Sequence, residues 1–197
     1  MSKISKVSKV SKIRKYIDLA LSILLISSVI LGYYKDLSHM SEYCFVSGLL
    51  VGITFFISYL YQKKHEKLLN ACIYLACTAD IFVIFIATVS IGLNLEGVFW
   101  FIHIINPIIL LIYWFVFCDQ MFMNGKGTIS VVVFPLLYML FAFVFFEISG
   151  SCPFPASLIF TDYTGFVPLA LLVGLAIILW MLGYAFHMLN RFIRRNK

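Results

Sequence analysis

Charged residues are scarce in this chain of 197 residues and make up only 12% of it. A typical soluble domain contains about 25% charged and about 45–50% apolar residues. Here the apolar share is 62% and the mean hydropathy is +1.01. This composition excludes an ordinary soluble domain and indicates an integral membrane protein. A crossing takes about 20 residues, so the chain has room for about six crossings.

The sequence also lacks the patterns of several common functional sites. It has no glycine-rich phosphate loop after a strand-like segment and no clustered metal ligands, so we expect neither a soluble cofactor nor a metal. Its five cysteines form no spaced metal or disulfide framework, and we do not expect a bridge between Cys44 and Cys152. The basic residues that give the net charge of +6 lie beside apolar runs, so we expect the protein to bind membrane lipids rather than nucleic acid.

Six apolar runs are present instead, each long enough to cross a bilayer. They lie at Tyr16–Tyr33, Tyr43–Tyr61, Leu68–Gly92, Val98–Cys118, Thr128–Ser149 and Phe166–Leu189. Because the connections are short, consecutive helices should be antiparallel neighbours. The predicted fold is therefore an all-α polytopic membrane protein with six transmembrane helices in an antiparallel bundle. The bundle occupies 16–189, between a basic arm at 1–15 and a basic tail at 190–197.

Lysine and arginine are distributed unevenly between the two sides of this bundle. Only Lys35 falls on one side, and the other fourteen of the 15 basic residues fall on the side of the termini. The positive-inside rule then predicts a cell-membrane protein with both termini in the cytoplasm. The arm at 1–15 is expected to rest on anionic head groups, each charge contributing up to about 1 kcal/mol. A signal peptide is the rival interpretation, but the run Tyr16–Tyr33 is longer than a usual signal sequence core.

The fourth apolar run carries an unusual polar group. His103 is followed there by Asn106 and Pro107. Residues three and four apart share a face of an α-helix, so all three are expected on one side. Polar side chains are costly against lipid and should face protein or a water-filled cavity. Two interpretations stay open: a histidine that hydrogen-bonds a neighbouring helix, and the general base of a site that opens to one side of the membrane.

The predicted orientation places candidate reaction partners at similar depth. Cys44 and Ser47 lie at the outer start of the second run, and His103 lies roughly 7–9 Å below the outer start of the fourth, at 1.5 Å per residue. These residues meet if the second and fourth helices pack together. Gly48 and Gly52 form a G-x-x-x-G spacing, which lets a neighbouring helix approach closely at this level.

Other polar residues of the apolar runs have two interpretations. Thr78 and Asp80 fall near the middle of the membrane, where a carboxyl group marks either a functional site or a protonated, hydrogen-bonded structural position. Asp18 and Glu147 lie near helix ends and are expected to be interfacial. His187 lies near the cytoplasmic end, far from the predicted outer site, and is also expected to be interfacial.

The longest outer connection reads GSCPFPASLIFTDYTG. Its two prolines and its aromatic residues predict an ordered segment rather than a flexible linker. It forms either a plain interfacial cap or a lid across the outer mouth of the bundle. Asp162 in this segment is the carboxylate that remains available to orient His103.

Several short motifs together resemble a known family. They are His103-x-x-x-Pro107 with Tyr113-Trp114, Phe134-Pro135-Leu136-Leu137-Tyr138, and Cys152-Pro153-Phe154-Pro155 followed by Gly165-Phe166. In this order they resemble a bacterial six-helix membrane family sometimes called Pr-six-Pr. That family is similar in layout to the androgen-induced and androgen-dependent six-helix proteins of animals, which hydrolyse fatty acid esters of hydroxy fatty acids.

The resemblance implies a lipid-ester hydrolase with a histidine on its fourth helix and a nucleophile on its second. The histidine is His103. The animal enzymes carry Tyr-Phe-Thr-x-x-Ser-Asn on the second helix, and this chain has Cys44 where the threonine is expected, Ser47 in its usual place and Gly48 instead of asparagine. The implied site therefore has His103 as base, Cys44 or Ser47 as nucleophile and Asn106 as a donor to the oxyanion.

Two alternatives to the hydrolase stay open. One is a small-solute or proton-coupled transporter centred on Asp80, since ionisable groups at mid-membrane often mark ion paths. The other is a non-enzymatic subunit that binds lipid or a protein partner, which a packed outer layer with no cavity at His103 would indicate.

Overall fold

The computed structural model describes residues 3–61, 67–118, 123–163 and 165–195, and within these ranges every regular element is helical. The main helices are α1 (Lys3–Tyr33), α2 (Tyr43–Leu60), α3 (Lys67–Ile91), α4 (Asn106–Phe117), α5 (Ser130–Ser149), α6 (Ser157–Phe160) and α7 (Val167–Arg195). A π-helical stretch, Phe101–Ile105, leads directly into α4. Several basic residues on which the orientation prediction depends lie outside the described residues: Lys63, Lys64, Lys197 and the side chains of 3–12 and 67–70.

Among the described residues, five helices are long and apolar enough to cross a membrane. Their apolar spans are Ile13–Tyr33, Tyr43–Leu60, Ala71–Ile91, Gly125–Ser149 and Val167–Arg195, which correspond to five of the six predicted runs. The run predicted at Val98–Cys118 forms a shorter apolar helix, Phe101–Phe117. The chain is therefore an all-helical protein with several helices suited to a bilayer.

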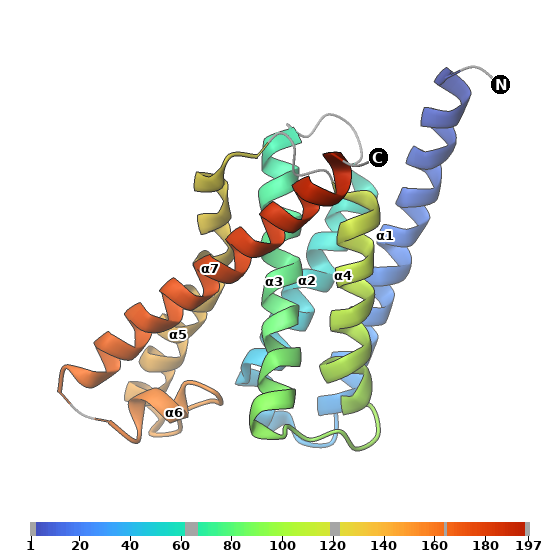
Figure 1. Cartoon of the computed structure of the whole chain (residues 1–197). Helices are drawn as coiled ribbons and strands as arrows, with labels where there is room; N and C mark the ends of the chain where they lie inside the picture. Colours follow the sequence, from blue (N-terminus) through green and yellow to red (C-terminus); the bar gives the residue numbers. More distant parts are fainter. Residues whose placement is uncertain (1–2, 62–66, 119–122, 164, 196–197) are drawn as a thin grey trace.

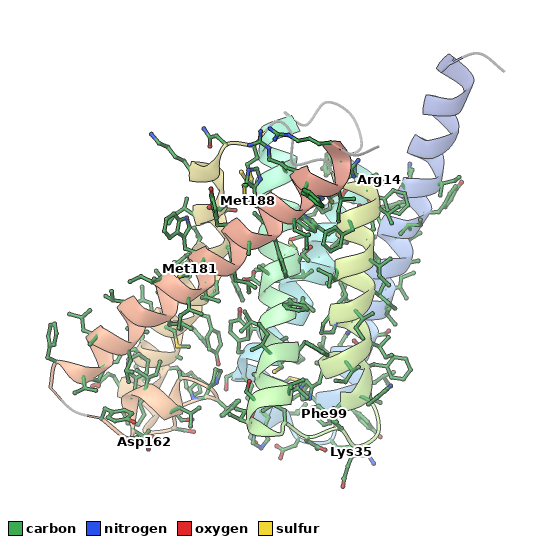
Figure 2. The ribbon with its side chains drawn as sticks, in the orientation of Figure 1. Arg14, Lys35, Phe99, Asp162, Met181 and Met188 are labelled. Carbon is green, nitrogen blue, oxygen red and sulfur yellow. The ribbon has the colours of Figure 1, made fainter. Side chains whose placement is uncertain are left out.

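The helices are not arranged as a symmetric bundle. Helices α1 to α4 stand side by side, whereas α5 and α7 lean away from them (Figure 1). Half of the apolar span of α3 is buried, 50%, but only 17% of that of α7, so α3 is central and α7 presents most of its surface outward. Both labelled chain ends lie on one side of the molecule, and Lys35 lies on the opposite side (Figures 1 and 2).

The glycines of α2 allow a neighbouring helix to pack closely against it, as their spacing predicted, and that neighbour is α1. A Cβ atom added to Gly48 would lie 2.6 Å from Val29 Cγ1, and one added to Gly52 would lie 2.6 Å from Ile26 Cγ1 and 3.3 Å from the Ile26 backbone nitrogen. Both contacts join α2 to α1, the pair of helices in most extensive contact. This packing sets the position of the first turn of α2, where Cys44 lies.

We expect Gly52→Ala to destabilise the protein. The added methyl group meets both the branched Ile26 side chain and its backbone, so neither can yield cheaply, and overpacking of this kind costs about 1–3 kcal/mol. Thermal unfolding in detergent measures the loss. The matched control is Gly174→Ala in α7, where a new Cβ has no neighbour within 4 Å and helix propensity favours alanine. Equal midpoints for the two variants would contradict the close packing.

A buried polar network joins α1 to α4 near the end of the molecule that holds the termini. Tyr113 Oη donates to Asp18 Oδ1 at 2.6 Å, and Ser58 Oγ donates to Asp18 Oδ2 at 2.9 Å. Arg14 Nε donates to Tyr113 Oη at 3.2 Å, and the Arg14 guanidinium lies over the Tyr74 ring. Asp18 is only 1% exposed, and its carboxylate is the centre of an interhelical network.

Candidate functional site

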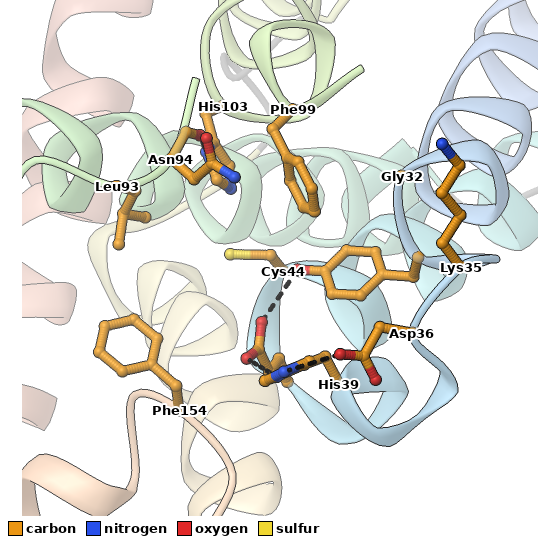
Figure 3. Close-up of a pocket in the computed structure, with 12 residues that line it drawn as sticks. Gly32, Lys35, Asp36, His39, Cys44, Leu93, Asn94, Phe99, His103 and Phe154 are labelled. Atoms are coloured by element: carbon orange, nitrogen blue, oxygen red, sulfur yellow. Dashed lines mark hydrogen bonds and ion pairs between the residues drawn. The ribbon is translucent and has the colours of Figure 1, made fainter. Parts of the chain in front are cut away.

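A pocket of about 520 Å³ opens at the end of the molecule opposite the termini. It lies between the end of α1, the start of α2, the segment that connects α3 to the π-helical stretch, and the long connection after α5 (Figure 3). Its lining residues are Gly32, Tyr33, Lys35, Asp36, His39, Glu42, Cys44, Leu93, Asn94, Phe99, His103 and Phe154. The pocket therefore brings together Cys44 and His103, the two residues that the sequence placed in one layer.

The local sequence explains why His103 occupies an irregular turn. Pro107 has no backbone N–H and cannot donate to the His103 carbonyl four residues earlier. The Asn106 N–H bonds instead to the carbonyl of Phe101, five residues back, which makes the turn π-helical. Single π-helical turns are frequent at functional sites because they redirect a side chain. This turn directs His103 to the pocket.

One hydrogen bond sets the tautomer of His103. Its Nδ1 lies 2.6 Å from the backbone carbonyl oxygen of Asn94, and a carbonyl can only accept, so Nδ1 carries the proton. Nε2 is then the nitrogen with the free lone pair, and it has no hydrogen-bond partner. The Phe99 ring packs beside the imidazole, with 5.7 Å between ring centroids. The histidine is thus oriented by one nitrogen, and the other nitrogen, which is buried, carries the lone pair that could accept a proton.

Cys44 lies in the first turn of α2, and its thiol is free. Figure 3 shows the sulfur atom projecting into the space between Leu93, Phe154 and His103. Of the residues proposed as nucleophile from the sequence, Cys44 is the one that lines the pocket. A thiol attacks a carbonyl once a base removes its proton, so this wall of the pocket has the components of a nucleophile and a base.

Ser47 and Asn106 lie behind the pocket wall. Ser47 is fully buried, and its hydroxyl donates to the Tyr43 carbonyl at 2.6 Å within its own helix. Asn106 Nδ2 donates to Ser28 Oγ of α1 at 2.8 Å. Neither residue lines the pocket. The expectation that Asn106 shares a face with His103 is wrong, because the π-helical turn adds a residue and rotates Asn106 toward α1.

A chain of polar contacts at the pocket mouth was not anticipated from the sequence. Tyr33 Oη donates to Glu42 Oε2 at 3.1 Å, and His39 Nδ1 lies 2.7 Å from Glu42 Oε1. His39 Nε2 is 3.4 Å from Asp36 Oδ2. Hydrogen bonds from Ser38 hold the pKa of Asp36 below its usual value. The spacing Asp36-x-x-His39-x-x-Glu42, next to the second helix, is the sequence signal that identifies this group.

The long outer connection contributes one wall of the pocket. Phe154 lines it, and the Phe154 carbonyl accepts hydrogen bonds from the Tyr43 N–H at 3.1 Å and from Tyr138 Oη at 2.9 Å. The segment is therefore anchored to α2 and α5, as an ordered cap. Asp162 is exposed and its carboxylate accepts from Thr161. The orienting partner of His103 is therefore the Asn94 carbonyl rather than Asp162.

Thr78 and Asp80 are buried in α3, away from the pocket lining. Thr78 donates to the Tyr74 carbonyl at 2.8 Å. The Asp80 carboxyl group and the Tyr43 hydroxyl of α2 lie beside each other in the buried interior and interact with each other. Within the described residues, no group of three or more histidine, cysteine, aspartate or glutamate side chains is arranged to hold a metal ion.

Comparison with known proteins does not extend this description: the chain matches no family model, no curated protein and no solved structure.

Proposed function

We propose that the protein crosses the cell membrane six times, with both termini in the cytoplasm. The sixth crossing is the helical run from Phe99 to Phe117, which continues through the π-helical stretch and is roughly 28 Å long at 1.5 Å per residue. That length is close to the hydrocarbon thickness of a bilayer, about 30 Å. In this orientation the pocket with Cys44 and His103 opens at the outer face, and Arg14 and α7's basic end lie at the inner face.

We infer that the pocket hydrolyses lipid esters with Cys44 as nucleophile and His103 as general base. The observation that carries this proposal is the tautomer of His103: Nδ1 donates to the Asn94 carbonyl, so the unpartnered Nε2 is basic and shares the pocket with a free thiol. A base held by a third group is one part of a base-activated nucleophile, and the proposed reaction requires the Cys44 sulfur to come within hydrogen-bond reach of Nε2. The motifs that resemble the Pr-six-Pr family and the animal ester hydrolases point to the same chemistry.

The reaction proceeds in two steps, and in each step His103 first accepts a proton and then returns it to the leaving group. His103 Nε2 accepts the proton of Cys44 as the sulfur attacks the ester carbonyl, and then returns that proton to the leaving alcohol oxygen, which leaves an acyl thioester on Cys44. In the second step Nε2 accepts a proton from water, whose oxygen attacks the thioester carbonyl. The proton then passes to the cysteine sulfur as the fatty acid departs.

The pocket walls suit an ester whose carbonyl is presented from the membrane. Leu93, Phe99 and Phe154 supply an apolar lining, while the charged residues lie at the mouth. A volume of about 520 Å³ falls within the usual range for small-molecule sites, about 300–1,000 Å³. It accommodates the ester group and the adjoining part of an acyl chain, with the remaining chain in the bilayer.

The test is acyl transfer to a single cysteine. Purified protein in nanodiscs is incubated with a fatty acid ester of a hydroxy fatty acid, and intact-protein mass spectrometry follows the acyl adduct. We expect free fatty acid to be released, and an adduct on Cys44 that neutral hydroxylamine removes. Cys44→Ala should abolish both, whereas Cys152→Ala, which removes a free cysteine of the outer connection away from the pocket lining, should preserve both. Hydrolysis that survives Cys44→Ala would contradict the proposed nucleophile.

A second candidate is proton-coupled transport, and the buried carboxyl group of Asp80 favours it. Asp80 is only 3% exposed, and its polar neighbour is the Tyr43 hydroxyl of α2. Proton uptake into liposomes, followed with an internal pH-sensitive dye, tests this function. Transport predicts uptake that Asp80→Asn abolishes and that the substitution His103→Gln leaves unchanged. An absence of uptake above that of protein-free liposomes excludes it.

A further inference from the structure

The C-terminal end of α7 carries basic side chains that pack into the protein. The sequence places His187 near the end of its helix, and its side chain is only 1% exposed, so protein covers it there. Arg191 and Arg194 follow at spacings of four and three residues, so all three share one face of α7. Both arginines are partly buried, whereas the neighbouring Arg195 is exposed. Figure 2 shows nitrogen atoms gathered at this end of the molecule, opposite the pocket.

Part of this group has a structural explanation. One terminal nitrogen of Arg194 lies 2.8 Å from the Cys118 carbonyl oxygen and 3.3 Å from that of Val116. Asn190 Nδ2 also donates to the Cys118 carbonyl, at 3.2 Å. These carbonyls end α4, where no further helical N–H groups are available, so Arg194 and Asn190 cap that helix from α7.

The remaining nitrogen atoms of the group have no such explanation. Arg191 Nε, Arg194 Nε and His187 Nδ1 are all buried and have no hydrogen-bond partner. Within the described part of the chain, neither arginine forms an ion pair with a carboxylate. A buried polar atom without a partner is costly, and in native proteins such an atom indicates a bound water or ion.

The side chains that carry these nitrogen atoms include two positively charged arginines, so the missing partner should be an anion. His187 and Arg191 are close enough to interact electrostatically. Asp18 and Arg194 both lie close enough to the Cys118 thiol to interact with it electrostatically. The Asp18 carboxylate, however, already accepts hydrogen bonds from Tyr113 and Ser58. Guanidinium groups bind phosphate oxygens through directed N–H donors and are weakly hydrated, so they do so even when partly buried.

We propose that His187, Arg191 and Arg194 bind the phosphate group of an anionic lipid at the inner face of the membrane. The site lies at the end of an apolar helix that is mostly unburied, so a lipid beside α7 reaches it without leaving the bilayer. Anionic lipids are concentrated in the cytoplasmic leaflet, and basic pockets between helices bind their head groups. The site is at the opposite end of the molecule from Cys44 and His103, and its occupancy is independent of any hydrolysis there.

Lipid retention in native mass spectrometry tests the site. Protein is reconstituted with phosphatidylcholine alone or with added phosphatidylglycerol, and the adduct that survives in the gas phase is quantified. Wild-type protein should retain phosphatidylglycerol at least about tenfold better than Arg191→Gln, since a charge-assisted hydrogen bond is lost. Arg195→Gln is the matched control, because it removes the same charge from an exposed neighbour, and it should retain the lipid as the wild type does.

Two further measurements identify the ligand and test whether the variant protein is folded. Arg191→Lys keeps the charge but loses the Nε donor, so it should elute as the wild type does on size exclusion and still bind phosphatidylglycerol less well. In lipid-free detergent, a thermal shift with inorganic phosphate that Arg191→Gln abolishes supports a phosphate site but overturns the lipid as its source. Equal loss in Arg191→Gln and Arg195→Gln, or no preference for phosphatidylglycerol, overturns the proposal.

Discussion

Replacing His103 with glutamine should lower kcat/KM for ester hydrolysis by roughly 10²–10⁴-fold, the usual contribution of a general base. Glutamine is similar in size and retains an N–H donor for the Asn94 carbonyl, which His103 Nδ1 now contacts at 2.6 Å. It cannot accept a proton from the Cys44 thiol at any physiological pH. The substitution therefore removes the base and preserves much of the packing. Release of labelled fatty acid from protein in nanodiscs measures the effect.

The matched control for this experiment is His39→Gln. His39 also lines the pocket but lies at its mouth, bound to Glu42 and exposed, and its side chain is not placed to accept the thiol proton. We expect its kcat/KM to stay within a few-fold of the wild type. If the two variants lose activity equally, the pocket acts through its overall shape or charge, and His103 is not the base.

Replacing Asp18 with leucine should lower the free energy of unfolding by about 3–5 kcal/mol, the range seen when one partner of a buried charged network is removed. The Tyr113 and Ser58 hydroxyl groups both donate to this carboxylate and would lose their acceptor. The partly buried guanidinium group of Arg14 would lose its neighbouring negative charge. Denaturant or thermal unfolding of detergent-solubilised protein measures the difference.

Glu147 supplies the control for that substitution. The sequence gives Asp18 and Glu147 the same interpretation, as carboxylates near helix ends, but Glu147 is exposed on α5. Exposed substitutions usually change stability by no more than about 0.5 kcal/mol, so Glu147→Leu should have little effect on unfolding. Tyr113→Phe, which removes the hydroxyl that donates to Asp18 and accepts from Arg14, should fall between the two at about 1–3 kcal/mol. A different order of the three variants would show that Asp18 is not the centre of the network.

Hydropathy and spacing were sufficient to predict the coarse architecture. Five predicted crossings correspond to helices suited to a bilayer, because a run of about 20 apolar residues is a strong signal by itself. The close approach of α1 at Gly48 and Gly52 followed from residue size alone. Cys44 and His103 line the same pocket, although not through the expected packing of the second helix against the fourth, because α2 packs mainly on α1.

The features that the sequence did not reveal depend on contacts between segments, which the spacing of apolar and polar residues along the chain does not show. The turn at Phe101–Ile105 departs from α-helical spacing, so Asn106 faces Ser28 rather than the pocket. The position of Asp18 near a predicted membrane boundary did not reveal that two other helices, α2 and α4, supply its hydrogen-bond partners. The bond from His103 to the Asn94 carbonyl involves a backbone group of a loop, which no side-chain pattern identifies.

The π-helical turn also separates the part of the helix that positions His103 from the part after Pro107 that packs in the core. Deletion of a single residue inside Phe101–Ile105 would convert the turn to ordinary α-helix and leave the residues after Pro107, such as Trp114, in their present packing. The same deletion within α4 would rotate every later side chain by about 100° and disturb the core. Changes in chain length at the turn therefore alter reactivity without altering the scaffold, which makes this stretch the natural place to insert or delete residues when redesigning the pocket.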